Sequence, residues 1–180
     1  MAIPVSHPIH RSQWEAPMAD VLITSRINPV EHITIRSEKS FEAVRDALEA
    51  TMPRLDTGIQ DALRWNDRAY TEDFDAHGPK LSIFLVRDHG SLLAIFGGAR
   101  KALQYEIGNP LTASKMTRYR LEATLYAPLR VTLFEDAEGR GVFEYDKPSC
   151  FFGQFGDERV AEMGRMLDEE IDAALRLAAG

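Results

Sequence analysis

An aspartate–histidine pair, Asp88-His89, is the part of the sequence best suited to acid–base chemistry. A carboxylate beside an imidazole can orient the ring as a general base, or leave it as a ligand of a metal or haem. Adjacent residues in a strand point in opposite directions, so Asp88 is better placed to hold His32 or His77 than its own neighbour. The alternative is a plain turn through Gly90, held by local side-chain hydrogen bonds.

A strand-to-helix corner at Gly108-Asn109-Pro110 is the second candidate. A strand-like run ends at Gly108, Asn109 is a favoured helix cap, and Pro110 suits the first turn. The free N–H groups of such a helix start favour an anion or a carboxylate. Thr112 and Lys115 follow within the next turn and would face the same group. A well-capped turn without a ligand is the competing interpretation.

Other reactive side chains give weaker signals. Cys150 has no base beside it in the sequence, which favours a buried structural thiol over a nucleophile. Gly97-Gly98 is too short for a dinucleotide-binding loop, and the sequence has no phosphate-binding, zinc-binding or Gly-x-Ser-x-Gly pattern. We therefore predict no metal site. The aromatic residues are expected in the core or at an interface rather than around a ligand; they are Trp14, Trp65, Phe151, Phe152 and Phe155.

The composition is that of a folded, acidic protein. The 180 residues suit one domain with one sizeable core, and the formal net charge is −7. That charge disfavours nucleic acid and anionic membranes as partners. No run approaches the ~20 apolar residues of a membrane span, and a single cysteine excludes an intrachain disulfide.

The proline-rich beginning, residues 1–20, predicts a flexible arm that lacks the apolar segment of a signal peptide. His7 and His10 in this arm could chelate a metal, but a disordered arm is the favoured interpretation. A cytoplasmic location is the default expectation.

The first third of the chain alternates strand, helix and loop. Alternating residues predict a strand over 30–36 with its isoleucines inward. A stripe of apolar residues predicts a helix over 41–52 that lies on the sheet. Capping-box spacing at Thr57 predicts a second helix to about Tyr70, and an acidic loop is expected over 71–80.

Two apolar runs, 81–86 and 92–96, flank a turn in the middle of the chain. They predict a hairpin, or a strand followed by an edge strand with a bulge, and in either case the centre of the sheet. A further strand is expected over 103–107, and the helix that starts at the Asn109 corner is expected over 111–120.

The last third predicts a hairpin and a long helix. Strands are expected over 129–134 and 142–145, antiparallel around an Asp-Ala-Glu-Gly turn. An aromatic and glycine linker at 151–156 precedes the last helix, which starts near Asp157 and carries an unbroken apolar stripe. Together the elements predict an α+β fold: a mostly antiparallel sheet with helices packed on one face, in a single domain over 21–180.

Several short motifs, in a fixed order, resemble those of a known family. They are Ser40-Phe41-Glu42, Asp88-His89, Gly108-Asn109-Pro110, Pro128 to Val131 with Glu135, Asp136 and Gly139, and finally Tyr145, Asp146 and Pro148. On these residues the chain resembles the bacterial and archaeal "domain of unknown function 302" family over roughly Ile33 to Ala178. Ile107 stands where the family usually has Phe, and the segment near 53–80 looks like an insertion. The resemblance implies a compact α+β domain that tends to form dimers and has no agreed activity.

The residues and the resemblance together give three hypotheses. The first is a cytoplasmic homodimer that binds a small ligand between the sheet and the Asn109 corner, through Asp88, His89, Gly108, Asn109, Thr112 and Tyr145. The second is an enzyme that uses His89 as general acid or base on a small, partly apolar substrate, with a haem protein as a variant. The third is an interaction module that presents the Trp65 helix and the Phe151–Phe155 segment. No cofactor is identified from sequence.

Overall fold

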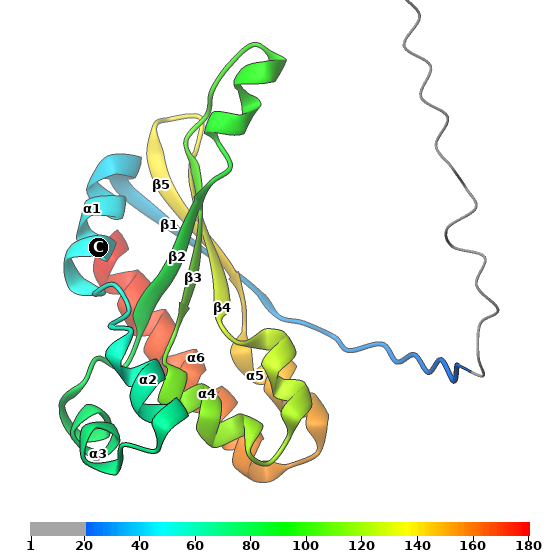
Figure 1. Ribbon diagram of the computed structural model, residues 1–180. Coiled ribbons are helices and arrows are strands. Elements are labelled where there is room, and N and C mark those ends of the chain that lie inside the picture. Colours follow the sequence, from blue (N-terminus) through cyan, green and yellow to red (C-terminus); the bar gives the residue numbers. More distant parts are fainter. Residues whose placement is uncertain (1–20) are drawn as a thin grey trace, which may run out of the picture.

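Five strands form one antiparallel sheet. The structure is a computed structural model, and it describes residues 21–180. The strands are β1 (His32–Ser40), β2 (Ser82–Asp88), β3 (Ala102–Gly108), β4 (Leu129–Glu135) and β5 (Arg140–Asp146). They lie in the order β1-β5-β4-β3-β2, so β4 is central and β1 and β2 are the edges (Figure 1). The arm predicted over 1–20, with His7, His10 and Trp14, lies outside the described residues.

Two helices cover one face of the sheet. α1 (Phe41–Thr51) and α6 (Glu158–Ala179) pack on the strands and on each other (Figure 1). Alternate residues of the strands point toward these helices and bury their apolar side chains there. The core includes Val44, Leu48, Tyr105, Val131, Leu133, Phe143, Ile171 and Leu175. The predicted α+β fold, with an antiparallel sheet and helices on one face, is confirmed.

Both covering helices begin at a capping side chain. Ser40 Oγ accepts a hydrogen bond from Ala43 N at 3.3 Å, and Asp157 Oδ1 accepts one from Arg159 N at 3.1 Å. The buried residues of α6 recur every three or four positions, as Val160, Gly164, Leu167, Ile171, Leu175 and Ala178. The predictions for these two helices are confirmed. Among residues 21–180, no helix combines the length and the apolar character that a membrane crossing requires.

The other face of the sheet carries polar side chains. Thr132 on β4 lies opposite both Glu144 on β5 and Gln104 on β3. At the edge, His32 lies 2.7 Å from Asp146 and 3.6 Å from Glu144. The hydrogen bond to Asp146 and the charges of both carboxylates raise the pKa of His32 above its usual value.

The second apolar run in the middle of the chain is not a strand. Residues Ser91–Phe96 form a short 3-10 helix, η2, at the tip of an arm that projects beyond the rest of the sheet (Figure 1). Gly90 N donates to Ala102 O at 3.0 Å and Arg100 N to Gly90 O at 3.3 Å, which closes the base of the arm before the apolar run begins. The run therefore has no strand to pair with. The prediction that these runs form the centre of the sheet is wrong, because β2 is an edge strand.

The segment between α1 and β2 contains two helices rather than one helix and a loop. α2 (Gly58–Trp65) ends at Asn66, whose backbone is left-handed with a φ of 56°. Asp67 then caps α3 (Arg68–His77) by accepting a backbone hydrogen bond at 3.1 Å. The acidic loop expected over 71–80 is therefore mostly helical.

Short helices close the end of the sheet at which Asn109 lies. They are α4 (Pro110–Thr117), the 3-10 helix η3 (Leu121–Tyr126), α5 (Pro148–Phe152) and the 3-10 helix η4 (Gly153–Phe155). The helix expected over 111–120 thus ends earlier, and the predicted linker at 151–156 is largely helical. These helices form the surroundings of the candidate site.

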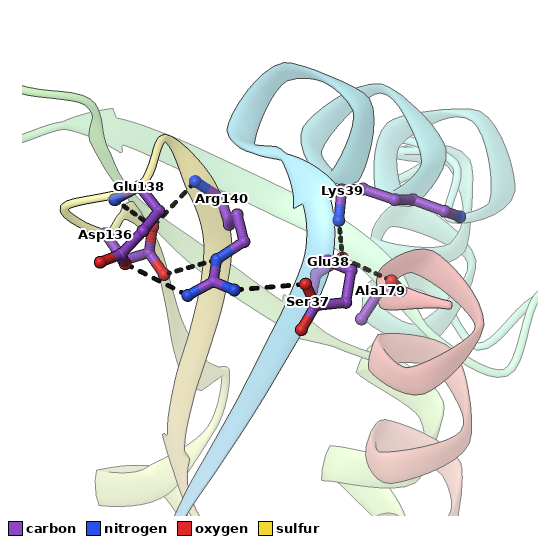
Figure 2. A network of polar contacts seen from close by, with 7 residues as sticks. All are labelled: Ser37, Glu38, Lys39, Asp136, Glu138, Arg140 and Ala179. Atoms are coloured by element: carbon purple, nitrogen blue, oxygen red, sulfur yellow. Dashed lines mark hydrogen bonds and ion pairs between the residues drawn. The ribbon is translucent and has the colours of Figure 1, made fainter.

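Polar contacts tie the β4–β5 turn and the end of α6 to β1. Arg140 donates hydrogen bonds to Asp136 within the turn and to Glu38 on β1 (Figure 2). The buried Ser37 donates to Ala179 O at 2.5 Å, which holds the last turn of α6 against β1 (Figure 2). Edge strand β1 is thereby fixed to both neighbouring elements.

Candidate functional site

The two centres suggested by the sequence lie at opposite ends of the β2–β3 hairpin. Ser82, at the start of β2, pairs with Gly108, whereas Asp88, at its other end, pairs near the start of β3. β2 has 7 residues, and a strand of that length spans roughly 20 Å. His89 lies just beyond one end of the hairpin and Asn109 just beyond the other. A single pocket of this chain is therefore not lined by both residues.

The Asp88-His89 pair forms a turn. Asp88 Oδ1 accepts a hydrogen bond from Ser91 N at 2.9 Å, and Ser91 Oγ donates to Asp88 O at 3.2 Å. His89 is exposed, and its ring makes no hydrogen bond or ion pair within the described part of the chain. Asp88 holds neither His32, whose partners lie on β5, nor His77, which contacts a carboxylate of its own helix at 3.0 Å. The contacts thus favour the turn interpretation.

The side chain of Asn109 is engaged in capping α4. Its Oδ1 accepts hydrogen bonds from Leu111 N at 2.9 Å and from Thr112 N at 3.2 Å. Its Nδ2 donates to Pro79 O at 3.1 Å, in the segment before β2. The N–H groups at the helix start already have acceptors, and an aspartate of α3 neutralises Lys115 at 2.6 Å. These contacts favour the well-capped turn over an anion site.

An apolar cavity of about 240 Å³ lies directly beside this corner. It is lined by Phe84, Ile107, Gly108, Asn109, Pro110, Thr112, Ala113, Met116, Ala127, Pro128, Leu129, Phe152 and Leu167. An engineered apolar cavity of about 150 Å³ accepts benzene, and pockets for drug-sized ligands begin near 300 Å³. The cavity is therefore the size of a molecule with one or two rings, or of a short acyl chain.

The empty space in the cavity depends on Gly108. A Cβ at this position would lie 3.6 Å from Phe84 Cε2 and 3.8 Å from Pro128 Cβ. These are ordinary van der Waals distances, so the backbone does not require glycine here. The missing side chain instead leaves room between Phe84 and Pro128. Thr112 is one of the lining residues, and its hydroxyl makes no hydrogen bond within residues 21–180.

The structure brings only some of the predicted ligand-binding residues together. Those that line the cavity are Gly108, Asn109 and Thr112. Tyr145 lies elsewhere: its hydroxyl is 3.4 Å from Asp172 Oδ1 on α6, and burial raises the pKa of Tyr145 to about 12. Asp88 and His89 lie at the far end of the hairpin.

Much of the lining carried no signal of a site in the sequence. Met116, Phe152 and Leu167 are buried apolar residues of helices, and such positions predict core packing. Phe84 lines the cavity from a bulge in β2, since Ile83 pairs with β3 and Leu85 pairs with the very next residue there. In the sequence, only the Gly108-Asn109-Pro110 corner indicated a candidate site at the position of this cavity.

Cys150 and the aromatic segment serve packing. Cys150 is half-buried, and its Sγ accepts a backbone hydrogen bond at 3.4 Å. Tyr126 stacks on Phe151 with ring centroids 4.7 Å apart and meets Phe152 edge to face. Trp65, by contrast, is 76% exposed. In the described part of the chain, no group of three or more His, Cys, Asp or Glu residues is arranged to hold a metal ion.

Comparison with known proteins identifies the fold and leaves the activity open. The family model described as "Domain of unknown function DUF302" matches residues 75–178. A solved structure, of an uncharacterized conserved DUF302 protein from Bacillus stearothermophilus, superimposes with a TM-score of 0.58 at 14% sequence identity. That likeness covers 82% of this chain and 97% of the other. No curated protein matches this chain significantly.

Proposed function

Since this chain belongs to the DUF302 family, for which no activity is agreed, we propose from the geometry alone that it binds a small, largely apolar molecule in the cavity beside Asn109. The observation that carries the proposal is the cavity itself, about 240 Å³ and lined mainly by apolar side chains. Ligand sites are typically concave, apolar and furnished with few polar groups. This cavity has those three properties.

The walls of the cavity come from strands and helices that are fixed by their own contacts. Asn109 bonds to the backbone of both α4 and the segment before β2, so the corner is rigid. Three of the lining residues, Ile107, Met116 and Phe152, are almost completely buried. A preformed site of this kind loses little conformational entropy when a ligand binds.

Thr112 is the polar group best placed to orient a ligand. The amide of Asn109 is occupied by backbone partners, whereas the Thr112 hydroxyl has none within the described residues. A hydroxyl both donates and accepts, so it suits a ligand with one N–H, hydroxyl or carbonyl group. The ligand class is thus a small ring compound or short chain with a single polar atom.

Indole and indene form a matched pair of probes for this proposal. The two molecules share one shape, but only indole has an N–H donor. We expect both to bind native protein with dissociation constants on the order of 0.1 mM, measured by isothermal calorimetry. Thr112→Val should weaken indole binding about fivefold and leave indene binding unchanged, because it removes the hydroxyl but keeps the shape.

Gly108→Ala tests the cavity rather than its polar group. The added methyl occupies the space between Phe84 and Pro128, so both probes should bind about tenfold more weakly. Gly98→Ala is the matched control, because a Cβ there meets nothing within 4 Å and Gly98 lies at the end of the β2–β3 hairpin away from Gly108. Equal affinities for the native and Gly108→Ala proteins would contradict the proposal.

Two further expectations from the sequence stay predictions. Self-association as a homodimer is implied by the family resemblance, and the exposed apolar side chains of the arm are compatible with it. A cytoplasmic location rests on the sequence alone.

A further inference from the structure

The tip of the β2–β3 arm, residues 91–98, exposes large apolar side chains. Leu92, Ile95 and Phe96 are 68%, 84% and 86% exposed. No charged residue occurs from Ser91 to Ala99. The arm tip projects beyond the sheet (Figure 1). Exposed apolar side chains gathered in this way mark a surface that binds a partner.

The strand that carries the arm has an open edge. β2 is the last strand of the sheet. Ile83 bonds to Pro53 O at 2.9 Å and to Leu55 N at 3.0 Å, so the connection after α1 covers the start of this edge. From residue 84 to 88, β2 pairs with β3 on one side, and no strand of the described chain pairs with its outer side. An open edge of this kind is a template for pairing with another chain.

A groove of about 430 Å³ lies beside the start of β2, between α6 and the connection after α1. Its apolar lining includes Met52, Leu81, Met166 and Leu177, and the Leu177 side chain is 67% exposed. Its charged residues are Lys80, Glu169 and Glu170, of which Lys80 and Glu170 pair with each other at 3.8 Å. We call this the α6 groove. It is separate from the cavity beside Asn109, and the two share no lining residue.

We propose that two copies of this chain pair antiparallel through the open edges of β2, so that the arm tip of each copy lies in the α6 groove of the other. Val86 is the middle of the open edge, and Ser91 and Leu81 are each five residues from it. In an antiparallel pairing about Val86, the arm of each copy points toward Leu81 of the partner subunit, at the start of its β2. Leu81 belongs to the α6 groove.

Charge supports a second copy as the occupant. Arg100, at the base of the arm tip, makes no ion pair within the described residues, and neither does Glu169 in the α6 groove. The neighbouring Lys101 is already neutralised by Glu42 and Glu135 at 2.6 Å and 2.7 Å. An anionic lipid surface would meet one free cation at the arm and a protein with a net charge of −7. The α6 groove, which offers apolar side chains and the carboxylate of Glu169, fits the arm tip better.

Sedimentation velocity of the full chain over a dilution series tests this pairing. We expect the native protein to sediment as a dimer. The triple variant Leu92→Ser, Ile95→Ser, Phe96→Ser should keep its circular dichroism spectrum, because these side chains are exposed, and should raise the dissociation constant at least about 100-fold. The control carries serine at Leu22, Ile23 and Ile27, which are similarly exposed but lie in the N-terminal segment, and it should remain a dimer.

A charge swap tests the placement of the arm tip. Arg100→Glu and Glu169→Arg should each weaken the dimer about fivefold, and the double variant should recover native affinity. A monomeric native protein, a dimeric arm-tip variant, or a double variant weaker than either single one would overturn the proposal. So would native protein that pellets with phosphatidylcholine vesicles through the arm tip without forming dimers. Indole affinity should not change in any of these variants. The sedimentation experiment therefore tests the pairing, and the calorimetric experiment tests the ligand cavity, independently of each other.

Discussion

The side chain of Asn109 donates a hydrogen bond to the carbonyl oxygen of Pro79 at 3.1 Å. This contact joins the start of α4 to the segment that leads into β2, across 30 residues of sequence. Through its Oδ1 atom the same side chain also caps α4. The cavity lies against this junction, and Asn109 is one of its lining residues.

Replacing Asn109 should therefore lower the free energy of unfolding by more than the loss of a helix cap alone would. Asn109→Ala removes the cap and leaves Pro79 O without its donor, and we expect the free energy of unfolding to fall by about 2 kcal/mol. Urea unfolding measures this change. Ser114→Ala, which removes an exposed hydroxyl bond within the same helix, is the control and should change stability by under about 0.5 kcal/mol. Similar effects of the two substitutions would contradict this role of Asn109.

Replacement by alanine should affect stability differently at two glycines of the sheet. Gly108→Ala places a methyl at ordinary contact distances and should change the free energy of unfolding by less than about 1 kcal/mol. Gly141→Ala places a Cβ 2.8 Å from Cγ2 of the fully buried Val44, which must shift, at a cost of about 1–3 kcal/mol. Thermal unfolding of both variants compares them directly, and equal melting temperatures would contradict the described packing.

The sequence predicts those parts of the fold in which local pattern and tertiary packing agree. α6 is an example, because its apolar stripe and the Asp157 cap both specify the helix that packs on the sheet. Residues 92–96 are the opposite case. Their apolar run is typical of a buried strand, yet the arm is closed at Gly90 and the run has no strand to pair with.

The candidate site is harder to predict because it depends on register. His89 and Asn109 each stand next to a strand, and nothing local shows that the two strands are antiparallel neighbours with these residues at opposite ends. Similarly, Met116 and Leu167 have the sequence pattern of core residues. Both line the cavity only in the folded chain, where the strands and helices bring them beside Gly108.

The acid stability of the protein should depend on Asp157. Its hydrogen bonds with the Arg159 side chain, and then with the Arg159 backbone, lower the pKa of Asp157 from 3.8 to about 2. A carboxyl whose pKa is lower in the folded state stabilises the fold above the unfolded pKa, and this contribution is lost as pH falls through the folded value. Asp157→Asn should therefore unfold more easily at neutral pH, and should lose less stability than native protein between pH 3.8 and about 2. Urea unfolding across this range measures both curves, and parallel curves would contradict the assignment.

His89 should be dispensable for ligand binding. Because it lies about one hairpin length from the cavity, His89→Ala is expected to leave the dissociation constants of indole and indene unchanged within about twofold. Calorimetric titration of His89→Ala and of Thr112→Val with both probes compares their dissociation constants. A loss of affinity in His89→Ala equal to that in Thr112→Val would place the histidine at the site and contradict the described arrangement.

A methyl NMR titration of the native protein with indole tests the central claim most directly. The cavity has methyl groups on Met116, Leu129 and Leu167, whereas Leu92 and Ile95 report on the arm tip and Leu177 on the α6 groove. We predict saturable shifts confined to the methyl groups that line the cavity, and Gly108→Ala should require more indole to reach the same shifts. Shifts centred on the arm tip or the α6 groove, or no saturable shift at the cavity, would contradict a ligand site beside Asn109.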